Sequence, residues 1–113
     1  MDLKQICIEA HKNSVEKGFW PLKPSCMSMP DGNCASALDQ AVIAQKLALI
    51  HSEVSEALEE LRKGNLQAIG GELADVVIRI GDLCGALKLD LDTEVQTKME
   101  RNKSRPAMHG KLS

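Results

Sequence analysis

Residues 47–61 read LALIHSEVSEALEEL, and this stretch decides the fold. Its large apolar residues recur at steps of three and four, which is the spacing of one face of an α-helix. These residues are Leu47, Ile50, Val54, Leu58 and Leu61. Gly64 follows directly after the periodic segment and is a typical helix stop. The pattern therefore predicts a helix over residues 37–63.

Similar patterns predict three more helices on either side of this one. Residues 2–17 carry apolar side chains roughly on one side. The segment after Gly64 also has apolar residues at helical spacing. The helix that they predict begins between residues 66 and 72, where two glycines weaken its first turn. A last helix runs to about Asn102, with Asp90 or Asp92 as its N-cap.

Size and composition narrow the fold class. The chain has 113 residues, of which 43% are hydrophobic and 27% charged, which predicts one globular domain over residues 1–113. Aromatic residues make up only 2%, so aliphatic side chains must form the core, which favours packed helices over a β-sandwich. Four helices with short links, apart from a loop over residues 18–36, predict an all-α protein built as a four-helix bundle.

Charge and hydropathy exclude several classes of function. The formal net charge is −2, whereas nucleic-acid binders usually carry a strong basic excess, so we expect no nucleic-acid partner. No apolar run approaches the ~18 residues of a membrane span, so we expect no membrane association. The first residues do not show a basic stretch followed by an apolar run, so a signal peptide is not expected and the protein is predicted to be cytoplasmic.

The four cysteines divide into two pairs. Cys7 and Cys84 lie in apolar helical patterns, which predicts buried free thiols. Cys26 and Cys34 share the predicted loop and could be bridged or could bind a metal together with His51. Free thiols are the usual state of intracellular cysteines, so the bridged and metal-bound forms of Cys26 and Cys34 are disfavoured.

Two acidic pairs are the strongest functional signal. Glu53 and Glu56 are three residues apart, as are Glu72 and Asp75, so each pair shares one helix face. The first acid of each pair lies roughly 80–90° around the helix axis from the centre of the apolar stripe. The direction of this rotation is the same on both helices. Antiparallel packing through these stripes would let both pairs line one groove. Converging carboxylates repel unless cations lie between them, and oxygen ligands suit Mg²⁺. The alternative is an exposed set that pairs with cations, such as Asp75 with Arg79.

The two pairs, separated by fifteen residues, resemble the signature of the all-α NTP pyrophosphohydrolases. That superfamily includes MazG, dimeric dUTPases, dCTP pyrophosphatases and phosphoribosyl-ATP pyrophosphohydrolase. The surrounding stretches LALIHSEVSEALE (47–59) and GELADVVIR (71–79) are similar as well, most of all to short phage- and mobile-element-type MazG-like proteins. Many relatives have a second Glu directly before the first motif Glu, where this chain has Ser52, which leaves the water-activating residue open.

The resemblance implies Mg²⁺-dependent hydrolysis of an NTP or dNTP to the monophosphate and pyrophosphate, as in nucleotide-pool house-cleaning, with Mn²⁺ as a substitute ion. The implied metal ligands are Glu53, Glu56, Glu72 and Asp75. One of the first two would also accept the proton of the attacking water. Residues implied to contact phosphates or sugar are Lys98, Asn102 and Arg105. For Lys98 and Arg105, together with Arg101 and Lys103, the alternative is an ordinary solvated helix end.

Several roles stay open at this stage. Trp20 either stacks on a base or caps the bundle core, and His51 either contacts substrate or is structural. Self-association as a homodimer or homotetramer is expected, because the apolar residues exceed what a lone unit of this size can hide. Two other functions remain: a phosphoribosyl-ATP pyrophosphohydrolase-like enzyme and a catalytically silent helical interaction module.

Overall fold

The computed structural model describes residues 1–21 and 37–105, and within these ranges it contains helices and no strand. All four predicted helices are present, which confirms the all-α prediction. The helices are α1 (Leu3–Glu16), α2 (Ala37–Arg62), α3 (Ile69–Leu87) and α4 (Leu91–Ser104), with a short 3₁₀ turn, η2 (Leu66–Ala68), before α3. None of the helices in the described part combines the length and hydrophobicity needed to cross a membrane.

Local sequence explains where the helices begin and end. Asp2 and Gln5 form a capping box at the start of α1, in which each side chain accepts a hydrogen bond from the other's backbone N–H. Gly64 ends α2 with a φ of 77°, a left-handed conformation that glycine adopts without strain. Of the two predicted caps for α4, Asp90 is the one used, and it accepts a hydrogen bond from the backbone N–H of Thr93.

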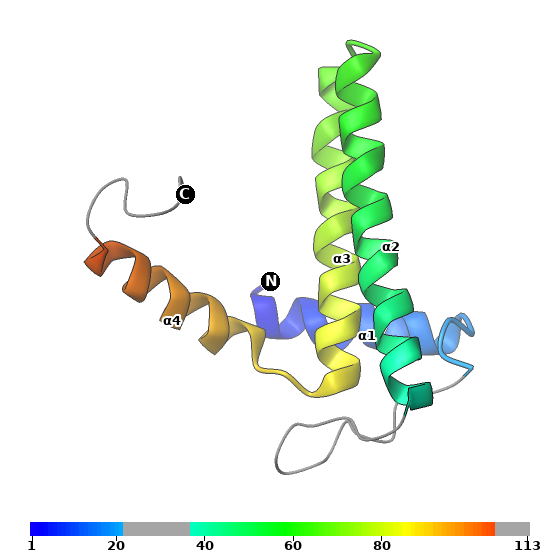
Figure 1. Cartoon of the computed structure of the whole chain (residues 1–113), viewed down its shortest axis with the longest axis vertical. Coiled ribbons are helices and arrows are strands. Elements are labelled where there is room, and N and C mark those ends of the chain that lie inside the picture. Colours follow the sequence, from blue (N-terminus) through cyan, green and yellow to red (C-terminus); the bar gives the residue numbers. More distant parts are fainter. Residues whose placement is uncertain (22–36, 106–113) are drawn as a thin grey trace.

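The helices α2 and α3 form a long antiparallel hairpin, and α1 crosses α3 near the C-terminal end of α3 (Figure 1). Gly81 and Gly85 of α3 allow α1 to pack closely against α3. A Cβ atom on Gly85 would lie 2.6 Å from the Cβ of His11 and 2.8 Å from the carbonyl oxygen of Cys7. The buried core beside this crossing contains Trp20, Leu83 and Ala86.

Helix α4 leads away from the hairpin, and its few contacts with the other helices are mainly with α1 (Figure 1). Its residues are exposed or half-buried, and none is fully buried. The described residues of a single chain therefore form a three-helix core with one projecting helix. The predicted four-helix bundle is present only in this partial form.

The hairpin buries only part of its apolar stripes: Leu83 of α3 belongs to the core and Ile50 of α2 packs against it, whereas much of the rest is exposed. On α2, Ala57 and Glu53 are buried at 8% and 9% exposure, whereas Leu58 of the stripe is 46% exposed. Helical geometry, at about 100° per residue, turns the stripes of both helices toward the side opposite the acidic pairs. We call this surface the outer apolar face. Its members, each 42–51% exposed, are Leu47, Val54, Leu58, Leu61, Leu73 and Val77. Packing through the stripes is thus confirmed only near the core, and the outer apolar face remains exposed in a single chain.

Candidate metal centre

Three carboxylates meet where α2 and α3 run side by side. Glu53 and Glu56 come from α2 and Glu72 comes from α3. One carboxylate oxygen from each lies within 4.8 Å of the other two, a spacing that one metal ion can bridge. The structure thus brings together three of the four carboxylates that the sequence motif singled out. Their role as metal ligands remains a prediction.

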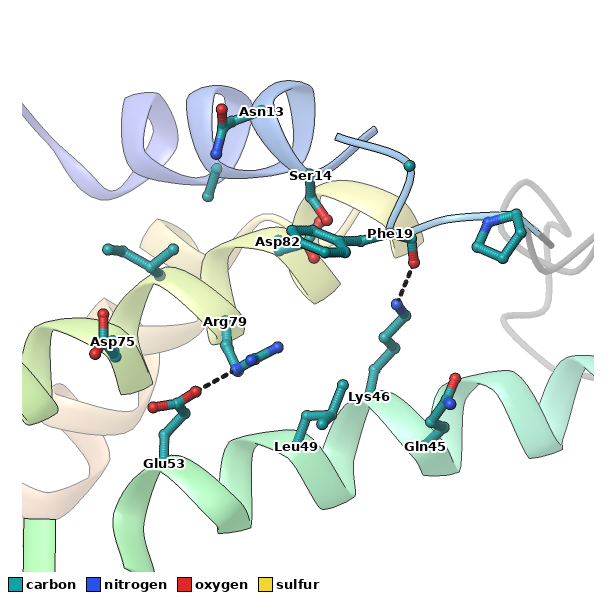
Figure 2. Close-up of a pocket in the computed structure, with 14 residues that line it drawn as sticks. Asn13, Ser14, Phe19, Gln45, Lys46, Leu49, Glu53, Asp75, Arg79 and Asp82 are labelled. Carbon is teal, nitrogen blue, oxygen red and sulfur yellow. Dashed lines mark hydrogen bonds and ion pairs between the residues drawn. The ribbon is translucent and has the colours of Figure 1, made fainter. Parts of the chain in front are cut away.

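The fourth carboxylate, Asp75, lies one helical turn after Glu72 and lines the same pocket as Glu53 (Figure 2). It lies outside the tight group of three oxygens. Its negative charge nevertheless acts on Glu56, where it contributes to a raised pKa. Asp75 therefore belongs to the same electrostatic environment as the other three.

Within the described residues, the carboxylates of the cluster act on one another electrostatically. A hydrogen bond with Glu53 and the negative charge of that side chain raise the pKa of Glu56 above its usual value. The charges of Glu72 and Asp75 raise it further. An oxygen-only donor set with several negative charges fits a hard divalent cation such as Mg²⁺ or Mn²⁺.

Arg79 contacts this cluster from α3. Its Nε donates a hydrogen bond of 2.7 Å to Oε1 of Glu53, and the two side chains are 42% and 11% exposed. This contact is the main reason that the pKa of Glu53 lies below its usual value. The sequence suggested that Arg79 would pair with Asp75 on its own helix, whereas the structure pairs it across the hairpin.

A pocket of about 550 Å³ opens beside the acidic cluster, within the usual size range for small-molecule sites. Its walls come from α1, α2, α3 and the segment after α1, and Glu53, Asp75 and Arg79 lie together in it (Figure 2). Away from the acids, the Nζ of Lys46 donates a hydrogen bond of 2.6 Å to the carbonyl oxygen of Phe19. The pocket therefore combines an acidic wall with two cationic side chains.

Trp20 is part of the core behind this pocket. It is 6% exposed, and its Nε1 donates a hydrogen bond of 2.8 Å to Oδ1 of Asp82. The same oxygen lies 2.9 Å from Nδ1 of His11, whose ring meets the indole edge to face at 5.5 Å. The Nζ of Lys46 lies 4.3 Å from the centre of the indole ring. Of the two roles left open for Trp20, the structure shows the core role.

Sequence reasoning missed His11, Lys46 and Asp82. Asp82 is 62 residues from Trp20 and 71 from His11 along the chain, so no local pattern could have paired them. For Lys46, the helical register offered one weak signal, because it lies seven residues before Glu53 on the same side of α2.

Other predicted residues lie away from the pocket. His51 is exposed on α2, so it is not a buried structural histidine. Residues on or just after α4 are exposed and do not line the pocket; they are Lys98, Asn102 and Arg105. Cys7 and Cys84 are buried free thiols, as predicted. The suggestions for Cys26 and Cys34 lie outside the described residues.

Comparison with known proteins adds no relative. No protein-family model matches the chain, and no curated protein or solved structure matches it either. The resemblance to the MazG-like superfamily therefore rests on the sequence motif alone.

Proposed function

We propose that this protein is a Mg²⁺-dependent nucleoside triphosphate pyrophosphohydrolase that cleaves an NTP or dNTP to the monophosphate and pyrophosphate. One observation carries the proposal: Glu53, Glu56 and Glu72 converge from two helices at the edge of a pocket of about 550 Å³. Gathering repelling carboxylates costs folding free energy, which a bound cation would offset. The acidic motif that resembles the superfamily supplies the reaction type.

In this proposal the acidic side chains hold the ion and activate water. Bound Mg²⁺ would neutralise phosphate charge and lower the pKa of a coordinated water. A hydrogen bond with Glu53 and the charges of the other acids raise the pKa of Glu56, so Glu56 is the better placed of the two to take the proton from the attacking water. Glu72 and Asp75 complete the ligand set from α3.

The pocket would hold the substrate with its triphosphate toward the acids. Lys46 and Arg79 lie along the pocket and can offset negative charge on phosphate oxygens as the P–O bond breaks. The rest of the pocket, with α1 on one side and Phe19 on another, leaves room for the nucleoside. A triphosphate ester therefore fits both the charge and the size of this space.

We also propose that the chain assembles as a homodimer or homotetramer through the outer apolar face. Exposed apolar patches of this kind commonly mark protein–protein contacts. Lys98 and Arg105 lie on or just after the projecting α4, so a phosphate contact requires that α4 of one copy reach the pocket of another. Mixing Glu56→Gln chains with Lys98→Ala chains, each inactive alone, should then restore part of the activity. No recovery on mixing would contradict this shared site.

A nucleotide panel tests the reaction itself. Canonical and damaged NTPs and dNTPs, together with phosphoribosyl-ATP, would be incubated with Mg²⁺ while pyrophosphate release is measured. We expect release from at least one nucleoside triphosphate and none when EDTA replaces Mg²⁺. Release from phosphoribosyl-ATP alone would move the assignment to the phosphoribosyl-ATP enzyme. The absence of any release would favour a silent interaction module.

A further inference from the structure

Arg79 contacts the acidic cluster from α3. It belongs to α3, yet its guanidinium reaches across the pocket to Glu53 on α2 (Figure 2). The bond uses Nε, so the two terminal nitrogens of the guanidinium take no part in this contact. Arg79 also lines the pocket, and its side chain is 42% exposed.

Its position sets up a competition for one carboxylate. Glu53 is 11% exposed, and its Oε1 accepts the hydrogen bond from Arg79. The group of three oxygens that could hold a cation also includes a carboxylate oxygen of Glu53. A divalent ion and a guanidinium repel each other, so close approach of the ion weakens or breaks the ion pair.

We propose that Arg79 exchanges partners during substrate binding: it leaves Glu53 when the ion binds there and then binds a phosphate group of the substrate. The inference rests on the proposed function above. An arginine has five N–H donors in a planar fork that matches phosphate oxygens, so a triphosphate in the pocket offers it a suitable anionic partner. The ion bound with its triphosphate thus supplies a new partner for both Glu53 and Arg79.

This exchange makes ion binding and phosphate binding cooperative. The ion alone must displace Arg79 without offering it another anion, so it binds more weakly than the carboxylates would otherwise allow. Phosphate removes that competition by holding Arg79. Linkage requires the two ligands to strengthen each other's binding by the same factor, and such factors are typically about five or more.

The test is calorimetric titration of the full chain, which needs no turnover. Mg²⁺ would be titrated into the wild type, Arg79→Gln and Arg62→Gln, first alone and then with inorganic tripolyphosphate as the probe. Arg62 is the matched control, because it pairs with Glu59 at the exposed end of α2. We expect Arg79→Gln to bind Mg²⁺ alone about fivefold more tightly than the wild type and to lose most of the strengthening by tripolyphosphate. Arg62→Gln should match the wild type.

Each outcome decides a different claim. Equal Mg²⁺ affinity and equal strengthening in wild type and Arg79→Gln would overturn the exchange while leaving the metal site in place. No Mg²⁺ binding by any folded variant would overturn both the exchange and the proposed function. Circular dichroism checks folding. If Arg79→Gln is unfolded, Arg79→Lys replaces it in the same titration. This variant keeps a cation near Glu53 but lacks the planar guanidinium that matches phosphate oxygens. Unchanged strengthening in that variant would also overturn the exchange.

Discussion

The two sides of the α2–α3 hairpin differ in chemistry but share one property. One side gathers Glu53, Glu56 and Glu72, whose charges repel. The opposite side leaves Leu58 and its neighbours about half exposed to water. Each arrangement is unfavourable for a chain on its own. The stability of a single chain explains neither side, whereas the proposed cation on one side and the proposed second copy on the other would explain both.

The largest expected effect is on the acidic side. Glu56→Gln keeps the size of the side chain but removes its charge, so turnover should fall by at least about a hundredfold, the usual scale for losing a general base. Far-UV circular dichroism should show unchanged helicity. Glu59→Gln is the matched control, because Glu59 lies on the same helix and pairs with Arg62 away from the cluster. Wild-type turnover in Glu56→Gln would remove its assigned role.

A substitution on the opposite side should affect assembly. Leu58→Asp puts a charge on the outer apolar face and should weaken self-association by about tenfold or more, since an unpaired charge at an apolar contact costs more than 1.4 kcal/mol. Light scattering or analytical ultracentrifugation measures the change. Ile8→Asp is the control, because Ile8 is a similarly exposed apolar residue on α1. A wild type that is monomeric at micromolar concentration would contradict the proposed interface.

The core contact between Trp20 and Asp82 should affect the stability of the fold. It should affect neither the acidic cluster nor the outer apolar face. Trp20→Phe removes the indole N–H and leaves the carboxylate without this donor, so we expect a loss of about 1–3 kcal/mol in the free energy of unfolding. Urea denaturation measures it. Phe19→Leu, at an adjacent residue that is 59% exposed, should change the stability little. Equal effects of the two substitutions would argue against the buried hydrogen bond.

The smallest effect concerns the thiols between α1 and α3. Burial raises the pKa of both Cys7 and Cys84 above 9.0, the usual value of a thiol. The unfolded chain therefore loses these protons first, so their contribution to stability is complete below pH 9.0 and declines as the pH rises above it. Alkylation of the native protein should be slow at pH 7 and accelerate with pH. Rapid labelling at pH 7 under native conditions would contradict the burial of the pair.

Sequence periodicity predicted the helices well because helix formation depends on local spacing. It also predicted that the two acidic pairs would meet, since both lie on the same rotational side of neighbouring helices. It did not predict which face of α2 packs against α3. In the structure Glu53 and Ala57 are buried, whereas Leu58 of the apolar stripe is exposed. A stripe of leucines shows that burial is needed but not whether α3 or a second copy provides it.

Long-range pairings were beyond local patterns. Arg79 had an acidic neighbour on its own helix, and only the packing of α2 against α3 shows that it contacts Glu53 instead. The contact of Asp82 with His11 and Trp20 likewise depends on how α1 crosses α3. Few tertiary contacts hold α4 in its direction. Nothing in its sequence indicated that it would leave the hairpin.

The most direct test of the account is Mn²⁺ binding, followed by electron paramagnetic resonance as the free-ion signal decreases, in the wild type and in Glu72→Gln. Glu72 is the one member of the three-oxygen group that comes from α3, so its charge matters only if the two helices share an ion. We predict saturable binding by the wild type, displacement by Mg²⁺, and at least tenfold weaker binding by the variant. Equal binding by the two proteins, or no binding by the wild type, would contradict the account.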